Sequence, residues 1–364
     1  MVLRSRLGIA GRVVMVTGAA GSIGSELCRQ LLRYAPAKLV CVDRAETPLF
    51  YLQQANSGLG GQKVYCLADI TDSARMRDIL HEHDVRVIFH AAAYKHVPLM
   101  EENLEEALKN NVFGLLSLLE VAGQSGCEDF LLISSDKAVA PTSFMGCTKR
   151  IGELIVSARP SAQMRCLSVR FGNVLGSQGS VIPVFREQIR SRRPITVTHP
   201  EITRYFMTIP EAVSLVLQAF VIGGKGDILV LDMGKPIRIL DMAKTLIRLS
   251  GLPLDEVKIV FTGLRPGEKM SEDLFYEFER RLTTSAEKVF RTRGPLISWP
   301  ELLSRLAVLR SESRTGISSR IRATVKEIVP QYQWAPPDHV RNIPVPLLTE
   351  PQNYRRHALS QGHD

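Results

Sequence analysis

Residues 12–24 read Arg-Val-Val-Met-Val-Thr-Gly-Ala-Ala-Gly-Ser-Ile-Gly. The apolar, mostly β-branched run that ends at Thr17 predicts a buried β-strand, which Gly18 stops. A helix is expected directly afterwards, over residues 22–34, because its apolar side chains recur at helical spacing on one face. The stretch therefore predicts a strand, a tight glycine turn and a helix in immediate succession.

The glycines of this turn fit a phosphate-binding loop. Gly18 permits the tight turn, Gly21 lets a pyrophosphate approach the backbone, and Gly24 lets the helix pack closely on the strand. With Ser22 and Ile23 they present the unpaired N–H groups and the partial positive charge of a helix N-terminus, which attract phosphate. A glycine-rich turn without a ligand is the structural alternative. At the first strand–helix junction of an alternating α/β chain, the pattern favours a dinucleotide.

Short apolar runs and amphipathic stretches alternate along the rest of the first half. Strands are expected at residues 38–42, 64–67, 85–89 and 130–133, and helices at 73–82, 103–124 and 145–158. This alternation predicts an α/β fold with a Rossmann-type, doubly wound parallel sheet and helices on both faces. The continuous apolar character of the strands agrees, because strands of such a sheet are covered on both sides.

Gly and Pro become frequent after residue 172, which indicates a change in architecture. We expect residues 1–172 to form the dinucleotide-binding Rossmann domain, with its sheet completed by later segments, and 173–285 to form a smaller substrate-binding lobe with helices near 210–222 and 238–250. Residues 286–334 should be basic and partly helical, near 299–328, and 335–364 a poorly ordered tail.

Composition restricts the class of protein. Of the 364 residues, 45% are hydrophobic and 23% are charged, which is enough apolar material for a folded core. The chain has no run of 18 apolar residues and no apolar signal core near its start, so we expect neither a membrane-spanning helix nor a secretory signal. The six cysteines lack metal-ligand spacing, so we expect no metal, no disulfide framework and a cytoplasmic location.

The net charge of +9 is concentrated near the C-terminus. Residues 280–326 contain 11 Lys and Arg and three acids, a balance of +8, which leaves about +1 for the rest of the chain. This concentration indicates a contact surface for phosphate, anionic lipid or an acidic neighbour, with a solvated helical face as the alternative. We expect no nucleic-acid partner and keep peripheral contact with the inner face of a membrane as one interpretation.

Acidic residues follow the second and third expected strands. Asp43 lies 19 residues beyond Gly24, where a carboxylate accepts from a ribose 2′-hydroxyl and repels a 2′-phosphate, so NAD is favoured. Arg44 follows directly and can accommodate a 2′-phosphate, which keeps NADP as an alternative. Asp69 and Ile70 are placed to meet the adenine ring, with a loop cap as the alternative for Asp69.

The pattern Thr-Gly-x-x-Gly-x-x-Gly in this α/β context resembles the extended short-chain dehydrogenase/reductase superfamily. Members of that superfamily usually carry Tyr-x-x-x-Lys at the start of the helix after the fifth strand. Here the residues are Met145-Gly146-Cys147-Thr148-Lys149, so the lysine is present and a methionine replaces the tyrosine.

Four further segments carry a closer resemblance. They are Ser134-Ser135-Asp136-Lys137 after the fifth strand, residues 90–98 after the fourth, residues 170–177, and Arg265-Pro266-Gly267-Glu268-Lys269. Together they resemble the UDP-N-acetylglucosamine 4,6-dehydratase family of polysaccharide and protein-glycan synthesis, and within it the subgroup with methionine at the tyrosine position. The resemblance covers residues 10–280 continuously.

The resemblance implies an enzyme that removes water across carbons 5 and 6 of a UDP-N-acetylhexosamine. Carbon 4 is first oxidised by NAD(P), and the hydride finally returns to carbon 6. Ser135, supported by Lys149, is implied as the base for the oxidation, and Lys149 also holds the nicotinamide ribose. Asp136 is the expected acid at the carbon 6 hydroxyl and Lys137 the expected base at carbon 5.

Basic and polar residues from several segments are expected to bind the ligands. Arg204 and Arg265 are candidates for the diphosphate, because Arg binds phosphate oxygens bidentately, with a structural salt bridge as the alternative for each. The remaining expected contacts are Asn173 and Glu268 with the substrate, Lys95 and His96 with the sugar, and Ala91 and Ala92 with the cofactor. A turn amide and a structural histidine are the alternatives for Asn173 and His96. We expect a UDP-sugar as partner and a homo-oligomer as the assembly.

Two other functions stay open. A nucleotide-sugar 4-epimerase shares the cofactor and the substrate class but returns hydride to carbon 4, so it has no need for the Asp136–Lys137 pair. A catalytically silent NAD-binding regulator is suggested by Met145, but it would not need Ser135 and Arg265 as well. The dehydratase is the leading interpretation, and the methionine subgroup implies retention of configuration at carbon 5.

Overall fold

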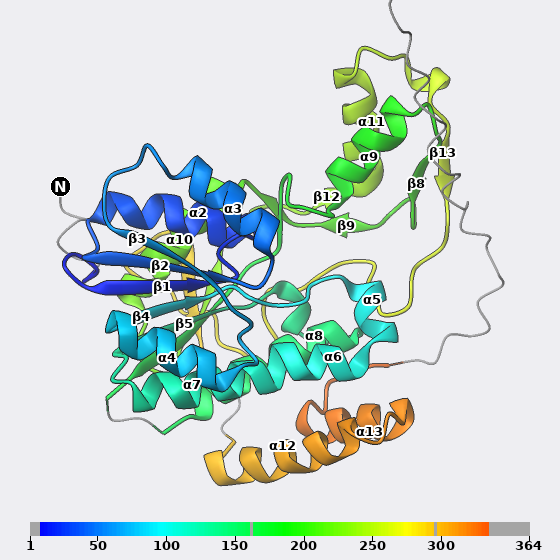
Figure 1. The fold of residues 1–364 in the computed structure, drawn as a ribbon. Coiled ribbons are helices and arrows are strands. Elements are labelled where there is room, and N and C mark those ends of the chain that lie inside the picture. The colour runs from blue at the N-terminus through cyan, green and yellow to red at the C-terminus, as the bar shows by residue number, and fades with distance from the viewer. Residues whose placement is uncertain (1–7, 161–162, 295–296, 335–364) are drawn as a thin grey trace, which may run out of the picture.

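The computed structural model describes residues 8–160, 163–294 and 297–334, and its centre is an eight-stranded sheet (Figure 1). In sheet order the strands are β14 (Val289–Thr292), β11 (Ile228–Leu231), β6 (Arg165–Arg170), β5 (Asp129–Ile133), β4 (Val87–His90), β1 (Val13–Thr17), β2 (Lys38–Asp43) and β3 (Lys63–Leu67). Neighbours pair in parallel, except that β14 runs antiparallel to β11. The predicted α/β Rossmann-type fold is confirmed. Chain order reverses between β1 and β4, and such sheets bind ligands at the carboxyl ends of the strands there.

Helices cover both faces of the sheet (Figure 1). One face carries α2 (Ser22–Leu31), α3 (Glu46–Ala55) and α10 (Ile209–Ile222), and the other carries α4 (Ser73–His83), α6 (Leu104–Leu108), α7 (Leu115–Gln124) and α8 (Phe144–Ala158). Successive side chains of a strand point to opposite faces, so Met15 joins the apolar cluster under α4 while Val14 and Val16 join the one under α2. Each face of the sheet thus buries its own core.

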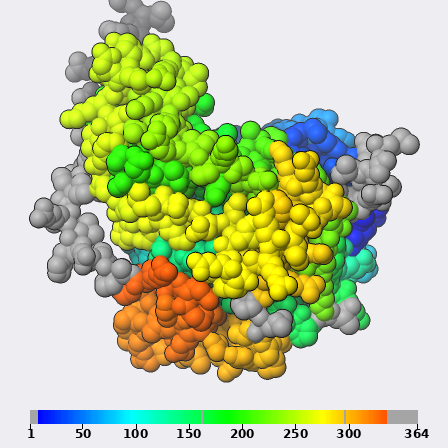
Figure 2. All heavy atoms as spheres, turned by 180° about the vertical axis from the view of Figure 1, so that it is seen from behind, coloured from blue at the N-terminus to red at the C-terminus, as the bar shows by residue number. Residues whose placement is uncertain are grey.

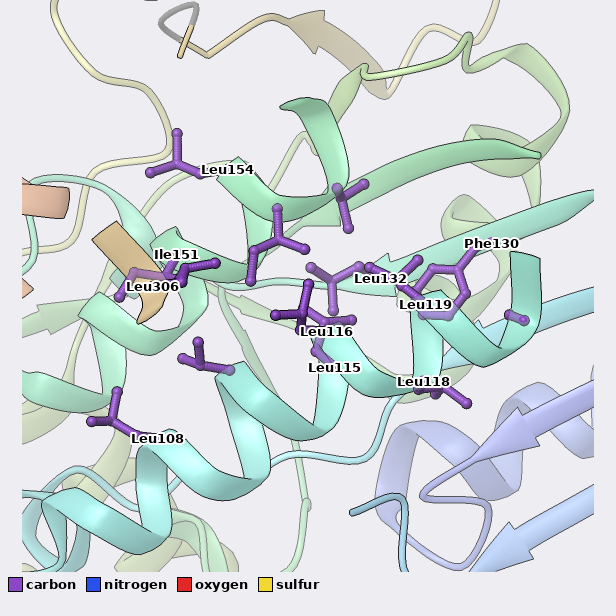
Figure 3. Packing of buried hydrophobic residues seen from close by; sticks show 14 of the residues in the cluster. Leu108, Leu115, Leu116, Leu118, Leu119, Phe130, Leu132, Ile151, Leu154 and Leu306 are labelled. Atoms are coloured by element: carbon purple, nitrogen blue, oxygen red, sulfur yellow. The ribbon is translucent and has the colours of Figure 1, made fainter. Parts of the chain in front are cut away.

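The core beside the candidate site lies between α7, α8 and β5. Figure 3 shows Leu115 and Leu119 of α7 near Leu132 of β5, with Ile151 of α8 in the same cluster. Leu306, from the C-terminal helix α12 (Trp299–Ser313), lies beside Ile151. Full burial of a side chain of this kind stabilises the fold by about 1.5–3 kcal/mol. Helix α8 is therefore packed between the sheet on one side and the C-terminal helix α12 on the other.

The predicted helix over residues 103–124 is interrupted by a π-helical turn at Lys109–Gly114. The Asn111 side chain accounts for it, because Oδ1 accepts from the N–H of Tyr94 at 2.9 Å and Nδ2 donates to the carbonyl of Tyr94 at 3.0 Å. The same Nδ2 donates to Oγ1 of Thr148 at 3.0 Å. The wider turn lets the amide reach the segment after β4, and such turns often mark functional sites.

A smaller lobe lies beyond the carboxyl ends of the strands (Figure 1). It contains α9 (Val181–Arg190), α11 (Ile239–Leu249), and the paired strands β8 (Ile195–Val197) and β13 (Ile259–Phe261). Two short strand pairs lead into it, β7 (Asn173–Val174) with β10 (Phe206–Met207) and β9 (Thr203–Arg204) with β12 (Ile237–Arg238). In the sequence, α10 and β11 of the Rossmann unit lie between elements of the lobe, so the two parts of the chain are interleaved. The domain boundaries expected at residues 172 and 285 stay predictions.

The C-terminal segment forms a helical hairpin of α12 and α13 (Ser318–Ile328), packed on α6 and α8. Figure 2 shows this hairpin (orange) below the yellow segment that connects β13 to β14. Some of its cations already have partners, since Arg310 lies over the ring of Phe113 and Arg320 pairs with Glu312. A contact between this basic region and an anionic neighbour stays a prediction. The tail expected to be poorly ordered, residues 335–364, lies outside the described residues.

Within the three described ranges, no helix has the length and apolar character needed to cross a bilayer. In the same part of the chain, no group of three or more His, Cys, Asp or Glu side chains is arranged to hold a metal ion. All six cysteines are free thiols and all are buried.

Candidate active site

A cleft of about 670 Å³ opens at the carboxyl ends of β1, β4, β5 and β6, where the sheet meets the smaller lobe. The predicted residues that line it are Gly18, Gly21, Ser22, Ile23, Gly24, Ala91, Lys95, His96, Ser135, Lys137, Lys149, Asn173, Arg204, Arg265 and Glu268. A second hollow of about 170 Å³ adjoins it at the glycine turn, and Asp43, Arg44, Asp69, Ile70 and Ala92 line this one. Asp136 is instead fully buried behind the surface of the cleft.

The glycine turn is tightly constrained. Gly18 has a φ of +66°, and a Cβ on it would lie 2.6 Å from the backbone nitrogen of Ala92, so a larger residue does not fit. A Cβ on Gly24 would overlap the carbonyl group of Gly18, because α2 packs directly on the turn. Gly21, the N-cap residue of α2, has no side chain with which to cap the helix. The turn and the first N–H groups of α2 therefore fit a pyrophosphate.

Asp43 closes β2 and ties the glycine turn to the sheet. Its Oδ2 accepts from the N–H of Ala20 at 2.9 Å, and its Oδ1 accepts from the N–H of Ala45 at 2.9 Å. Each carboxylate oxygen has a further lone pair, so a ribose hydroxyl can still donate to it.

Arg44 and Asp69 face each other in the second hollow. Arg44 Nη1 lies 3.4 Å from Asp69 Oδ2, and the guanidinium lies 4.5 Å from the centre of the Tyr94 ring. Asp69 Oδ1 also accepts from the N–H and the hydroxyl of Thr71, each at 2.8 Å, so Asp69 caps its loop as well as lining the hollow. An adenosine ribose or its 2′-phosphate would meet these groups, so the hollow fits both NAD and NADP.

The end of β5 carries the centre of the site. A 3-10 turn begins there at Asp136, with the side chain of Ser135 as its cap. Ser135 Oγ donates to Asp136 Oδ1 at 2.8 Å, and Lys137 Nζ donates to the same oxygen at 3.1 Å. Lys137 also donates to Asn173 Oδ1 at 3.0 Å. Oδ1 of Asp136, the expected acid, thus accepts hydrogen bonds from both Ser135 and Lys137, the two expected bases.

The second carboxylate oxygen of Asp136 is exceptional. Oδ2 is buried and has no hydrogen-bond partner among the described residues. Oδ2 lies next to Gly172, and a Cβ at position 172 would lie only 3.2 Å from this oxygen. The absence of a side chain at Gly172 therefore leaves the space beside Oδ2 unfilled. Buried polar atoms in proteins are rarely unpartnered. Oδ2 is therefore the atom of Asp136 that still has an open hydrogen-bonding position.

A second carboxylate, Glu272, lies beside Lys137. Its Oε1 is 3.6 Å from Lys137 Nζ and 3.8 Å from Arg204 Nε. Burial lowers the pKa of Lys137, but Asp136 and Glu272 more than offset this, so the pKa lies above its ordinary value. Burial raises the pKa of Glu272, and Lys137 reverses only part of that shift. Lys137 is therefore an ammonium in the free protein and has to release a proton before it can act as a base.

Met145 and Lys149 stand on the first turns of α8, and both line the cleft. Lys149 Nζ donates to the carbonyl oxygen of Ile133 at 3.0 Å. Burial lowers the pKa of Lys149 to about 8, so its ammonium form predominates at neutral pH and titrates just above it. The hydroxyl of Ser135 bonds to Asp136 rather than to Lys149. The support expected from Lys149 is therefore a nearby charge and not a direct hydrogen bond.

A buried ionic network lies beneath the cleft. Glu153 of α8 accepts from Arg170 of β6 at 2.8 and 3.0 Å, and from Arg150 at 2.8 Å. Arg170 also pairs with Glu279 at 2.7 Å, and the hydroxyl of Ser134 donates to Glu153 at 2.7 Å. Burial raises the pKa of Glu153, but the two guanidinium groups prevail and lower it to about 2. The network joins β5, β6 and α8 directly below the site.

Arg204, Arg265 and Glu268 meet on the lobe side of the cleft. Arg204 is 7% exposed, donates to the carbonyl oxygens of Thr203 and Lys269 at 2.7 and 2.9 Å, and lies 3.4 Å from Glu268. These contacts match the structural alternative considered for Arg204. Glu268 also accepts from the N–H of Arg265 at 3.1 Å, which orders the turn. The Arg265 side chain is exposed, which makes it the better placed cation for a diphosphate.

Lys95 and His96 contact the segment that follows β7. Lys95 Nζ donates to the carbonyl of Gln178 at 2.8 Å, and the imidazole of His96 packs against Gly179. The N–H of Gln178 in turn donates to Ser22 Oγ at 3.1 Å. Residues 178 and 179 therefore contact both the phosphate loop, at Ser22, and the residues after β4, at Lys95 and His96. Contact of Lys95 and His96 with a sugar stays a prediction.

Three residues of the site are not found by sequence reasoning. Glu272 lies in an irregular segment without periodicity, and its sole signal is an acid four residues beyond Glu268. Asn110 and Asn111 place two polar amides inside an otherwise apolar helical pattern, and this break in the pattern was the available signal of a site residue. Gln178 acts through its backbone, which leaves no trace in a side-chain pattern.

A family model described as polysaccharide biosynthesis protein matches residues 14–294. The chain belongs to this family. It is 43% identical over 321 residues to "Probable polysaccharide biosynthesis protein EpsC" of Bacillus subtilis (strain 168), and 45% identical over 288 residues to "Capsular polysaccharide biosynthesis protein CapD" of Staphylococcus aureus. The matches cover 87% and 78% of this chain but 54% and 48% of these relatives, so this member of the polysaccharide biosynthesis family spans about half their length.

Solved structures agree with the fold. Pen from Bacillus thuringiensis is 30% identical with a TM-score of 0.73, over 80% of this chain and 90% of its own. A dTDP-glucose 4,6-dehydratase from Streptomyces venezuelae, solved with NAD and TYD bound, has a TM-score of 0.65 at 19% identity, over 85% and 99% of the two chains. Among the curated relatives is also a UDP-glucose 4-epimerase of Rickettsia bellii (strain OSU 85-389), 32% identical over 72% of this chain and 77% of its own length.

Proposed function

We propose that this protein catalyses the NAD-dependent 4,6-dehydration of a UDP-N-acetylhexosamine, with UDP-N-acetylglucosamine as the expected substrate, for a surface polysaccharide or glycan. The Asp136–Lys137 pair at the end of β5 carries the proposal. Loss of water needs an acid and a base within reach of adjacent carbons, and here the two groups are 3.1 Å apart. The relatives named for polysaccharide biosynthesis support the pathway class.

Ser135 is proposed to start the reaction at carbon 4. Its hydroxyl donates to Asp136 at 2.8 Å and accepts from the N–H of Lys137 at 3.3 Å, so one lone pair is left to accept the proton of the 4-hydroxyl. As it accepts that proton, it passes its own to Asp136. The ammonium of Lys149 stabilises negative charge that develops on the oxygens during this step.

Asp136 and Lys137 then act on carbons 6 and 5. Asp136 now carries a proton and delivers it to the departing 6-hydroxyl, while Lys137 takes the proton from carbon 5, which the 4-ketone acidifies. The C5–H and C6–O bonds break, a C5=C6 double bond forms and one water leaves. Lys137 has to be neutral for this, and Glu272, 3.6 Å away, is placed to take its proton.

The last step restores the site. Lys137 returns the proton to carbon 5 from the face on which it was removed, so the configuration is retained. Glu272 then gives its proton back to Lys137, and all groups regain their starting charges. During the elimination Asp136 thus holds the proton for the 6-hydroxyl, Glu272 holds the proton released by Lys137, and neutral Lys137 supplies the lone pair that takes the proton from carbon 5.

NAD fits the two hollows. The glycine turn and α2 would hold its pyrophosphate, Asp43 its adenosine ribose and Lys149 its nicotinamide ribose. When bound, the nicotinamide would take hydride from carbon 4 and supply it to carbon 6, so the cofactor ends each cycle as it began. NADP is the alternative, because Arg44 borders the same hollow.

The lobe side of the cleft is proposed to bind the UDP-sugar. Arg265 would meet the diphosphate, Arg204 and Glu268 would shape the turn that presents it, and Asn173, Lys95 and His96 would meet the sugar and phosphate groups. A cytoplasmic location, free or at the inner face of a membrane, and a homo-oligomeric assembly belong to the same proposal.

Incubation of the purified protein with UDP-N-acetylglucosamine tests the reaction. Mass spectrometry should show a product lighter by one water, and the Asp136→Asn protein should not form it. A product of unchanged mass with inverted carbon 4 would instead establish the epimerase, which the Rickettsia relative favours. No conversion of any UDP-N-acetylhexosamine, with NAD still bound, would favour the silent regulator.

A further inference from the structure

The segment from residue 138 to 144 joins the two halves of the candidate site. Asp136 and Lys137 precede it, and Met145 and Lys149 follow it on α8. Within it, Ala140 has a φ of +37°, a conformation that is strained for a residue with a Cβ. Such a conformation persists only where surrounding contacts hold it. The contacts on this segment therefore determine how the two halves of the site face each other.

Residues inside the family match hold the first part of the segment. The hydroxyl of Tyr276 donates to the carbonyl of Ala138 at 2.7 Å. Lys269 Nζ donates to the carbonyl of Val139 at 2.9 Å. Both donors come from the irregular chain between β13 and β14.

The second part is held by the C-terminal hairpin. Arg322 of α13 is 8% exposed, and its Nη2 lies 2.9 Å from Glu101 Oε2 and 3.1 Å from the carbonyl of Glu101. The other oxygen of this carboxylate accepts from the N–H of Phe144, the first residue of α8, at 2.5 Å. Just beyond the hairpin, the N–H of Gln333 donates to the carbonyl of Pro141 at 2.9 Å. The hairpin and Gln333 thus connect at two points to residues 138–144, which we call the catalytic segment.

Tyr332 fixes the guanidinium in this position. Its hydroxyl accepts from Arg322 Nη1 at 2.6 Å, and its carbonyl accepts from Lys326. The Tyr332 side chain is itself buried, and Arg322 lies 4.7 Å from the ring centre of Trp334. The planar fork of an arginine can hold a carboxylate and a hydroxyl at once, which the point charge of a lysine does less well.

We propose that the C-terminal hairpin is a positioning element of the catalytic segment, and that Arg322 is its positioning residue. Arg322 acts through Glu101 on the N-terminus of α8, and so on the placement of Met145 and Lys149. These contacts come from residues beyond 294, where the family model ends. The kinetic test rests on the proposed function, whereas the exchange test below does not.

The kinetic test compares Arg322→Ala, Glu101→Ala and the double variant. Each single variant should lower kcat for UDP-N-acetylglucosamine by about 10–100-fold, the effect of roughly 1 Å of misplacement, with KM within about twofold. The double variant should fall no further than the worse single variant, because both remove one link. Arg322→Lys should recover part of kcat. The control is Arg320→Ala on the same helix, because the Arg320 side chain is 56% exposed and pairs with Glu312 within the hairpin itself, and this variant should keep the wild-type kcat.

Hydrogen exchange read by mass spectrometry tests the same link without any substrate. Amides of residues 137–149 should exchange at least about tenfold faster in Arg322→Ala than in the wild type, while those of 17–30 and the whole Arg320→Ala protein stay unchanged. Equal acceleration over the whole chain, no acceleration at 137–149, or additive kinetic losses would each overturn the inference. If Arg322→Ala does not fold, Tyr332→Phe, which removes only one hydroxyl, carries the same test. A wild type that does not convert UDP-N-acetylglucosamine would refute the proposed function alone.

Discussion

Replacing Glu153 with Gln should strongly destabilise the protein without changing the shape of the side chain. The carboxylate accepts from Arg170, Arg150 and Ser134 at 2.7–3.0 Å, and all four side chains are buried. Glutamine keeps the volume but removes the charge. Two buried guanidinium groups would then share one carboxylate, that of Glu279.

Two independent routes give the magnitude. Removing one partner of a buried ion pair typically costs about 3–5 kcal/mol, because a charge is left uncompensated. The pKa of Glu153 falls from 4.5 to about 2, and each unit corresponds to 1.36 kcal/mol, which gives about 3 kcal/mol. We therefore expect a loss of about 3–5 kcal/mol at neutral pH.

Urea unfolding followed by circular dichroism measures this loss. The matched control is Glu187→Gln, whose carboxylate pairs with Arg190 at 2.9 Å on the surface, and it should cost less than about 1 kcal/mol. Because the folded pKa of Glu153 is depressed, its contribution is complete above pH 4.5 and is lost as the pH falls toward 2. The gap between wild type and Glu153→Gln should therefore narrow over that window. A gap below about 1 kcal/mol at pH 7, or one that does not depend on pH, would refute the reasoning.

Three further predictions concern the proposed reaction. Asp136→Asn and Lys137→Ala should each slow water loss by ~10²–10⁴-fold with cofactor binding intact. Glu272→Gln should make reduced nicotinamide accumulate. Near-full turnover in any of these three variants would show that the elimination step is misassigned. Protein purified without added cofactor should release NAD(H) when denatured, and an empty supernatant together with no uptake of NAD or NADP would count against it. NMR of the fresh product should show UDP-2-acetamido-2,6-dideoxy-D-xylo-hexos-4-ulose, whereas the L-arabino isomer would contradict retention but not dehydration.

The fold could be predicted because its strands are apolar along their whole length. Strands expected at 38–42 and 130–133 correspond to β2 and β5, since a parallel sheet covered on both faces needs continuous apolar runs. Helices α3 and α9 lack an equally clean signal. Phe50 and Tyr51 of α3 are more than half exposed, so its apolar residues do not mark one face. Helix α9 has an amphipathic pattern, but a proline, Pro183, stands inside its first turn, where a helix would not be expected to continue.

The part of the site that follows the strands was also accessible from sequence. Parallel strands bring their carboxyl ends to one edge, so residues after β1, β4 and β5 must meet there. Glu272 is different, because tertiary contacts of the lobe bring it to Lys137 from an irregular segment. The burial of Asp136 and the structural contacts of Arg204 likewise depend on packing between segments that are far apart in the chain.

The methionine at position 145 changes where a proton can go. Met145 is 2% exposed and lines the cleft, so the place usually taken by a tyrosine hydroxyl holds no group that titrates. In the proposed reaction the Ser135 hydroxyl is the acceptor at the end of β5, and it donates its own proton to Asp136 over 2.8 Å. The proton removed in the proposed oxidation would thereby arrive on Asp136, the group that needs one for the elimination. In the proposed reaction the carboxylate of Asp136 therefore links the oxidation to the elimination, and the neighbouring Lys137–Glu272 pair would hold the remaining proton until carbon 5 requires it.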